Sequence, residues 1–454
     1  MQLESRGVEL ADRALGEAVA AAQRAAEEAD LVVLPEATYP GYVLHEEEDF
    51  QDPKWWRQGI EAFAGVASQG KAYVVVGLTR SVAGRVRNTA AVLSPNGNVA
   101  GVADKCFLWH FDALWFAPGV PGEVLRLPFG DAGVFVCADA RMMEIPRRLV
   151  LDGARLLCDS TALVLGPTGT NSQIEYMLAA RAWENGAFLA VANKSGYEAG
   201  IAHYAGRSVI YGPDGKQVAE ADAQGSSIIY AEIDLAAAGG PRGRREPESY
   251  ASLGAETGPG VTNMLSSPPP AGPLRIAMVQ FPTEEERLQR ELVADLVIAR
   301  GVIESQSVLS VSEGQFRWGV STFDSGELLS VADARLGLLS GDRLSVPEEA
   351  RRLMLEGANV LIWDRPKNDR TPIAVMRTRA DENRVFLIVT SADEDWIVIA
   401  PNGTIQSRRR PEDKLEAVLV ELHLALAWAK EMAPGTDVVA NRQPENYMDL
   451  ARSE

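Results

Sequence analysis

The stretch GVFVCADARMMEIPRRLVLDGARLL, residues 133–157, decides the fold class of this chain. Its first part, 133–139, is a short apolar run typical of a buried strand, and 144–154 predicts a helix ending near Gly153. The same alternation continues on both sides, with hairpins between, and favours an α/β fold with layers around a mixed sheet. We expect helices over 8–29, 144–154 and 172–186, strands over 31–36, 72–78, 133–139 and 187–193, and hairpins over 88–102 and 208–221.

The composition excludes several classes of protein. The 454 residues carry 44 Lys and Arg and 63 Asp and Glu, a net charge of −19. This acidity argues against a nucleic-acid partner, which would need a basic face, and against docking on anionic membranes. Hydrophobic residues make up 46%, as in ordinary globular proteins, and no apolar run approaches the ~18 residues that cross a bilayer.

The cysteine count and the first residues bear on the compartment. Three cysteines are too few for a disulfide scaffold, and MQLESRGVELADR lacks the basic segment and apolar core of a signal peptide. We therefore expect a cytoplasmic protein with reduced thiols. Its length fits up to three domains, and two large ones equally well.

The chain contains an internal repeat. Four segments recur in the same order at an offset near ~200 residues, which indicates duplication of one domain. The pairs are 181–191 with 379–389, 146–157 with 349–362, 210–218 with 399–405, and 244–250 with 441–447. We expect a first domain over 1–250, a Pro/Gly/Ser-rich linker without periodicity over 251–273, and a second domain over 274–454.

Three residues that could perform chemistry follow predicted strands. Cys137 lies between a buried strand and a helix, Glu36 ends the strand 31–36, and Lys105 follows the hairpin 88–102. Ligands bind at the carboxyl ends of strands in α/β sheets. A cysteine nucleophile needs a base and an oxyanion donor, which a carboxylate, an ammonium and nearby backbone N–H groups could supply. Only folding could bring these residues together.

Five segments in unbroken order resemble the nitrilase superfamily of carbon–nitrogen hydrolases. They are LVVLPEATYPGY, NTAAVLSPNGNVAGVADK, FAPG, GVFVCADARMMEIPRRLVLDGARLL and RAWENGAFLAVAN, within residues 10–250. The resemblance implies an αββα sandwich, two of which pack as an αββα–αββα pair. The family's Glu–Lys–Cys triad falls on Glu36, Lys105 and Cys137. It implies no metal and no organic cofactor.

The resemblance also supplies roles. Glu36 would be the general base, Lys105 and the N–H of Ala138 would hold the oxyanion, and a thioester would form on Cys137. Asp112 stands where the family usually has a second Glu, so its shorter arm could weaken that role. Further residues expected around the substrate are Tyr42, Trp109, Arg141 and Asn193. Core or lid packing remains an equal alternative for Trp109, His110 and Trp115, and Asn193 could simply end a strand.

The sequence after the nucleophile, Cys137-Ala138-Asp139-Ala140-Arg141, resembles the amidase and carbamoylase pattern rather than the Cys-Trp-Glu of true nitrilases. We therefore expect hydrolysis of a small amide or ureido substrate. Acyl transfer to an amine and a non-catalytic scaffold remain alternatives. The acidic run at 45–49 is interpreted as a solvated loop and not as a metal site.

The second copy lacks the catalytic pattern. LGLLSGD, 336–342, replaces the nucleophile strand and places Ser340 or Gly341 at the cysteine position, and no cysteine follows Cys158. We expect an inactive copy that replaces the partner subunit in an intrachain pseudo-dimer, which could assemble further into a homo-oligomer.

The first copy also lacks a counterpart of the strand RIAMVQ, 275–280. Either it has lost this edge strand, the alternative we favour, or the second copy's strand covers that edge.

Overall fold

The structure is a computed structural model that describes residues 1–43, 52–255, 259–280, 294–300, 308–391, 395–409 and 417–451. The chain divides into two compact units. Unit 1 comprises Met1–Arg242 with Ala433–Thr436, and unit 2 comprises Gly243–Met432 with Asp437–Glu454. Among the described residues, no helix combines the length and the apolar character that crossing a bilayer requires.

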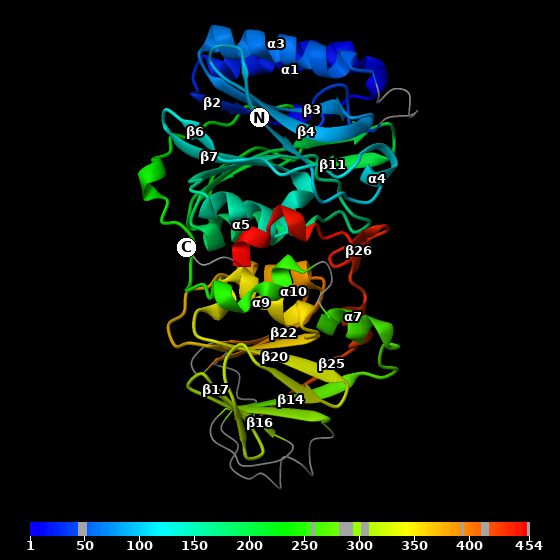
Figure 1. The fold of residues 1–454 in the computed structure, drawn as a ribbon, viewed down its shortest axis with the longest axis vertical. Helices are drawn as coiled ribbons and strands as arrows, with labels where there is room; N and C mark the ends of the chain where they lie inside the picture. The colour runs from blue at the N-terminus through cyan, green and yellow to red at the C-terminus, as the bar shows by residue number, and fades with distance from the viewer. Residues whose placement is uncertain are drawn as a thin grey trace. The chain divides into compact units, whose positions relative to one another are not determined.

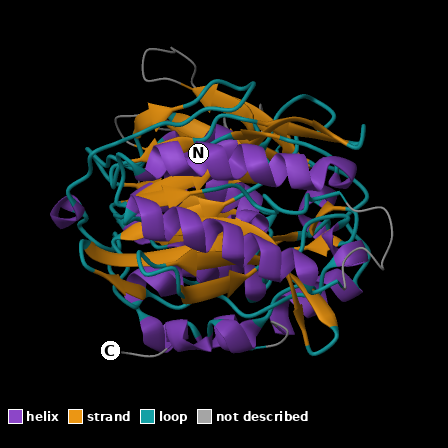
Figure 2. Ribbon diagram, turned by 90° about the horizontal axis from the view of Figure 1, so that it is seen from above, coloured by secondary structure: helices purple, strands orange, loops and turns teal. Residues whose placement is uncertain are grey.

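One sheet of unit 1 has four strands and is covered by two helices. The strand order is β2 (Leu31–Val33), β3 (Tyr73–Val82), β4 (Arg85–Leu93) and β5 (Val99–Asp104), and only the β2–β3 pair is parallel. Helices α1 (Ala11–Ala26) and α3 (Lys54–Gly70) lie side by side on its outer face, as Figures 1 and 2 show. The α1 residues that face the sheet are alanines, which allows close packing.

The other sheet of unit 1 carries the nucleophile strand. Its order is β13 (Gln217–Glu220), β12 (Val209–Tyr211), β9 (Phe188–Ala192), β8 (Leu156–Ser160), β7 (Gly130–Val136) and β6 (Leu125–Leu127). Its central strands β7, β8 and β9 are parallel.

Helices α5 (Glu144–Leu151) and α6 (Leu178–Asn185) pack on the outer face of this second sheet, and its inner face contacts the four-stranded sheet. Unit 1 is therefore the αββα sandwich that the resemblance implied. A small sheet of β1 (Leu3–Glu4), β10 (Lys194–Glu198) and β11 (Ala202–Ala205) lies beside it.

Unit 2 repeats this plan with two six-stranded sheets. One shared apolar core draws on both sheets, and α9 (Pro347–Leu355) and α10 (Ile373–Asn383) cover the second. The first sheet has the order β18 (Ser321–Phe323), β17 (Gln315–Trp318), β16 (Val308–Ser312), β15 (Leu296–Arg300), β14 (Leu274–Gln280) and β25 (Ala417–Leu422). The second has β19 (Leu328–Val331), β20 (Ala334–Ser340), β21 (Val360–Arg365), β22 (Phe386–Ser391), β23 (Trp396–Ile399) and β24 (Ile405–Arg409).

The repeated sequences make the same contacts in the two predicted copies, although both members of the last pair, 244–250 and 441–447, lie in unit 2. Arg181 donates from Nε to the Ala140 carbonyl and pairs with Glu184 at 2.6 Å. Arg379 donates likewise to the Leu344 carbonyl and pairs with Glu382 at 2.6 Å. The N–H groups of Glu246 and Gln443 each donate to the tyrosine hydroxyl four residues later, within PESY and PENY. These matches support the predicted duplication.

The segment 251–273, which we expected to be an unstructured linker, contains a 3₁₀ turn at Ala251–Gly254 and the helix α7 (Pro259–Ser266). Unit 2 already begins at Gly243, and its first residues join its fold through the pair of Arg245 with Glu348 at 2.8 Å. The Pro/Gly/Ser content hid α7, although Pro is favoured at a first helical position, and the Gly that follows lowers helix propensity without preventing a helix that packs on α9.

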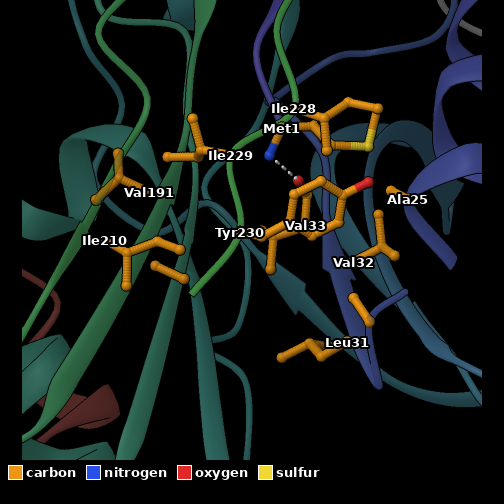
Figure 3. Close-up of a pocket in the computed structure, with 12 residues that line it drawn as sticks. Met1, Ala25, Leu31, Val32, Val33, Val191, Ile210, Ile228, Ile229 and Tyr230 are labelled. Atoms are coloured by element: carbon orange, nitrogen blue, oxygen red, sulfur yellow. Dashed lines mark hydrogen bonds between the residues drawn. The ribbon is translucent and has the colours of Figure 1, made fainter. Parts of the chain in front are cut away.

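In the described part of unit 1, β2 is the edge strand of the four-stranded sheet, and no further strand pairs with it. In unit 2, β14 pairs in parallel with β15 and antiparallel with β25, so it does not cover the edge of unit 1, and that alternative is wrong. A pocket at this edge is lined by Leu31, Val32 and Val33 together with residues 228–230, as Figure 3 shows. The Met1 amino group donates to the Val33 carbonyl at 2.8 Å there.

Several element boundaries differ from the expected ones. The strand 31–36 stops at Val33. The strand 133–139 stops at Val136, because a 3₁₀ helix begins at Cys137. The helix 172–186 begins as a π-turn, Gln173–Met177, before α6. The acidic run at 45–49 lies outside the described residues.

Candidate active site

Cys137 occupies a strained turn at the carboxyl end of β7. Its φ of +54° lies in the left-handed region, which is costly for a residue with a side chain and is often found at functional sites. A 3₁₀ helix, Cys137–Arg141, follows at once. Side chains hold both sides of the turn: the Cys137 N–H donates to Asp159 Oδ1 at 2.8 Å, and the Val136 N–H donates to Asp139 Oδ2 at 3.2 Å.

Asp139 also ties this turn to the loop that carries the lysine. Its Oδ1 accepts the N–H groups of Cys106 at 3.0 Å and Phe107 at 2.8 Å. Lys105 directly precedes them, so its position is fixed relative to Cys137. Burial raises the pKa of the Asp139 carboxyl to about 7, and these backbone donors oppose that rise.

The structure brings Glu36 and Lys105 together. Lys105 Nζ lies 2.8 Å from Glu36 Oε1, and both side chains are fully buried. Asn88 Nδ2 donates to the same oxygen at 2.6 Å. The second oxygen, Glu36 Oε2, is buried without a hydrogen-bond partner among the described residues, so it is available to receive a proton.

Asp112 completes a carboxylate–ammonium–carboxylate arrangement. Its Oδ2 lies 2.6 Å from Lys105 Nζ and accepts the Trp109 N–H at 2.7 Å, and its Oδ1 accepts the Tyr42 hydroxyl. The shorter side chain of Asp112 thus reaches the lysine because the short helix α4 (Asp112–Trp115) starts at this residue. Tyr42 contacts Asp112 and lies with its ring 5.6 Å from Lys105 Nζ.

The electrostatics around the sulfur favour a neutral thiol at rest. Burial raises the pKa of the Cys137 thiol well above its usual value, and the negative charge of Glu36 raises it further. Lys105 and the Thr161 hydroxyl lower it, but do not outweigh burial. Lys105 itself stays charged: burial lowers its pKa, and the attraction of Asp112 and Glu36 more than compensates.

Arg141 and Trp109 pair with each other. The guanidinium of Arg141 lies 4.3 Å from the Trp109 ring centroid, and Arg141 Nε donates to Gln173 Oε1 at 3.0 Å. Gln173 Nε2 in turn donates to the Cys137 carbonyl at 3.0 Å. Both predicted residues are therefore linked to the turn of the nucleophile. Ala138 directly follows Cys137 and is the second residue of the 3₁₀ helix.

Asn193 has contacts of a different kind. Its Oδ1 accepts the N–H groups of Leu163 and Lys194, and its Nδ2 donates to the Gly206 carbonyl at 2.6 Å. These bonds join the end of β9 to neighbouring loops. They support the structural alternative that the sequence left open for this residue.

Aromatic side chains surround Tyr42. Its ring makes edge contacts with Phe111 at 5.6 Å and with Trp115 and Tyr204 at 6.3 Å. The loop before Phe111 is held from the far end of the sequence, because the His110 N–H donates to the hydroxyl of Thr436 at 2.7 Å. Thr436 belongs to unit 1.

Sequence reasoning missed five residues of this site: Asn88, Asp159, Thr161, Gln173 and Glu198. Glu198 accepts the N–H groups of Tyr42 and Val43 and so fixes their loop. Asp159 and Thr161 had a signal, since LLCDST changes from apolar to polar residues at the end of a predicted buried strand. Gln173 bonds the Arg141 guanidinium and the Cys137 carbonyl, and Glu198 bonds two backbone N–H groups, which no local pattern indicates.

The corresponding turn of unit 2 holds Gly341. Val136 pairs with Ser160 across β7 and β8, and Ser340 pairs with Asp364 across β20 and β21. The residue after each strand therefore corresponds, so Gly341, with φ of +63°, takes the position of Cys137. This register decides between the two residues that the sequence left open.

Comparisons with known proteins point to the family that the sequence resembles. A family model described as carbon–nitrogen hydrolase matches residues 4–242. A nitrilase of Pyrococcus abyssi is 30% identical over 211 residues, which cover 46% of this chain and 78% of that protein. An N-carbamoylputrescine amidase of Arabidopsis thaliana is 30% identical over 165 residues, covering 33% of this chain and 55% of that protein.

An omega-amidase of Xenopus tropicalis is 27% identical over 219 residues, covering 46% of this chain and 77% of that protein. A crystal structure of an amidase from Nesterenkonia sp. is 28% identical, with a TM-score of 0.44, and covers 49% of this chain and 85% of its own. The family match and the nitrilase confirm the predicted resemblance: this chain belongs to the carbon–nitrogen hydrolase family, the nitrilase superfamily.

Proposed function

We propose that the protein hydrolyses the C–N bond of a small amide or N-carbamoyl compound with Cys137 as the nucleophile. The observation that carries this proposal is the buried Lys105, held between Glu36 and Asp112 next to a cysteine in a strained turn. The omega-amidase and the N-carbamoylputrescine amidase among the relatives support amide and ureido substrates, and the sequence after Cys137, which resembles the amidase and carbamoylase pattern, favours these over nitriles.

The first half-reaction forms a thioester. Glu36 takes the proton from the Cys137 thiol as the sulfur attacks the carbonyl carbon, and the carbonyl oxygen becomes an oxyanion. Lys105 and the N–H of Ala138 stabilise that oxyanion. When the intermediate collapses, the C–N bond breaks, Glu36 returns its proton to the nitrogen, and ammonia or an amine leaves.

The second half-reaction releases the acid. Glu36 takes a proton from water, the hydroxyl oxygen attacks the thioester carbon, and the C–S bond breaks with the proton returning to sulfur. An amide yields a carboxylic acid, and a carbamoyl group yields a carbamic acid that loses carbon dioxide.

The resting charges fit this sequence of steps. Because burial raises the pKa of the Cys137 thiol, the base must act during attack rather than before it. Lys105 and Asn88 both donate to Glu36 Oε1, which leaves Oε2 to carry the proton. Asp112 offsets the charge of Lys105, so the lysine is not held by Glu36 alone.

The test is ammonia release from a panel of small amides, ureido acids and nitriles. Wild type should turn over at least one amide or ureido acid, and Cys137→Ala should show no turnover while keeping its circular dichroism spectrum. Cys158→Ala is the matched control, because Cys158 is a buried thiol of the neighbouring strand β8. Turnover by Cys137→Ala at the wild-type rate would refute the assignment.

Acyl transfer is the alternative outcome of the same thioester. Adding hydroxylamine or amines to the reaction separates the two functions, because a transferase gives mainly the amine adduct whereas a hydrolase gives mainly the acid.

A further inference from the structure

We propose that Asp159 is the positioning residue of the nucleophile turn, and that it acts as the acceptor of the Cys137 N–H. This inference rests on the proposed role of Cys137. Asp159 lies on β8, which pairs in parallel with β7, and its carboxyl group is fully buried. The distance from the Cys137 nitrogen to Asp159 Oδ1 is 2.8 Å.

The turn needs such an acceptor. Cys137 lies one residue beyond the last paired residue of β7, where the hydrogen-bond ladder of the parallel sheet ends. A buried N–H without a partner is costly, so an acceptor must come from a side chain. Asp159 supplies it from the strand next to the nucleophile and thereby fixes the direction of the Cys137 side chain and of the Ala138 N–H.

Unit 2 shows what replaces this contact where the cysteine is absent. The register of β20 and β21 places Trp363 at the position of Asp159, and Gly341 at the position of Cys137. There the side chain is a donor: Trp363 Nε1 donates to the Gly341 carbonyl at 3.1 Å. A glycine adopts a positive φ without strain, and Gly341 is exposed, so its N–H does not require an acceptor from the protein.

The acceptor works in its neutral form. Burial raises the pKa of the Asp159 carboxyl well above its usual range, the charges of Glu36 and Asp139 raise it further, and Lys105 and the Cys137 N–H only partly oppose this. Asp159 Oδ2 is buried without a hydrogen-bond partner among the described residues, so no donor at this oxygen stabilises the charged form. An amide oxygen should therefore replace the carboxyl oxygen.

The experiment compares Asp159→Asn, which keeps an acceptor, with Asp159→Ala, which removes it. We expect Asp159→Ala to lower kcat about tenfold to a hundredfold with KM within about threefold, because a misplaced nucleophile slows chemistry more than binding. Alkylation of Cys137 by iodoacetamide, followed by peptide mass spectrometry, should slow in the same variant. Asp159→Asn should stay within about threefold of wild type in both measurements.

Ser160→Ala is the matched control. Ser160 is the next residue of β8, it is buried, and its hydroxyl donates to the Leu34 carbonyl at 2.9 Å. Its loss should lower the melting temperature without changing the alkylation rate of Cys137. If Asp159→Ala does not fold, Asp159→Val fills more of the space, still lacks an acceptor, and takes its place.

Two results would overturn the inference: an Asp159→Ala enzyme as active and as reactive at Cys137 as wild type, or an Asp159→Asn enzyme as impaired as Asp159→Ala. Failure of the proposed function looks different, because Cys137→Ala would then retain turnover or wild-type Cys137 would not react with iodoacetamide.

Discussion

The nucleophile turns of the two units have the same backbone and different chemistry. Cys137 and Gly341 both follow a central parallel strand, and both have a φ near +60°, at +54° and +63°. Around Cys137 lie a buried carboxylate and a buried ammonium. The turn is therefore a property of the α/β scaffold, whereas reactivity depends on the side chains that surround it.

The strand ends of unit 2 are joined by a different set of charges. Arg300 at the end of β15 pairs with Asp364 on β21, and Asp364 also accepts the Gly314 N–H at 2.8 Å. This ion pair joins the two sheets of unit 2. At the strand ends of unit 1, Glu36 and Lys105 are instead groups that can exchange protons. The comparison implies that residues of the triad affect activity strongly, whereas changes in unit 2 affect mainly stability.

Glu36→Gln should have the largest effect on activity. The amide keeps the shape but cannot take a proton, so kcat/KM should fall about a thousandfold or more. The same change should lower the pKa of the Cys137 thiol, because the Glu36 charge raises it. The measurement is turnover together with the pH profile of Cys137 alkylation. A variant that loses activity while its thiol pKa rises would contradict this account of Glu36.

Lys105→Met should remove both activity and stability. It leaves Glu36 and Asp112 buried with no cation between them, and removing one partner of a buried pair costs about 3–5 kcal/mol. Denaturant unfolding measures this loss. Lys216→Met, which breaks an exposed pair with Asp214, is the control and should change stability far less, because an exposed ion pair is screened by water. Equal losses in the two variants would show that Lys105 is not held as described.

Lys430→Met should change how the stability of unit 2 depends on pH. Burial lowers the pKa of Lys430 from 10.5 to about 7, so the unfolded chain binds a proton that the folded chain has released between these values. Stability therefore rises from pH 7 towards pH 10 in wild type, and this rise should be smaller in Lys430→Met. Denaturant unfolding at pH 7 and pH 9.5 tests this. An unchanged pH dependence would show that burial does not lower the pKa of Lys430.

Gly341→Cys, made in the Cys137→Ala background, should have the smallest effect on stability and should restore no activity. A side chain at this φ costs on the order of 1 kcal/mol, and a Cβ at Gly341 would meet no atom within 4 Å. No turnover should return, because the residues around Gly341 include Trp363 in place of Asp159. Ammonia release by this variant would show that the turn alone is sufficient and would break the comparison between the units.

The sequence predicted the parts of the molecule that depend on local pattern. Buried apolar runs located the central strands, and the resemblance to the nitrilase superfamily assigned Glu36, Lys105 and Cys137, which follow such runs, to a catalytic triad. The sequence also showed that segments 181–191 and 379–389 repeat each other, and in the structure Arg181 and Arg379 make the same contacts.

The sequence could not show contacts that only the tertiary fold creates. Asp159 acts on a backbone N–H of another strand, Thr436 approaches from over 300 residues away, and Asn193 bonds to backbone groups of neighbouring loops. The helix α7 was missed because its stability comes from packing against α9 rather than from propensity.

The most direct test of the central claim is peptide mass spectrometry after acid quench during turnover of an amide substrate. The account predicts an acyl group on the peptide that contains Cys137, and none on the peptides of Cys106, Cys158 or Gly341. An acyl group on a different residue, or turnover by Cys137→Ala, would contradict it.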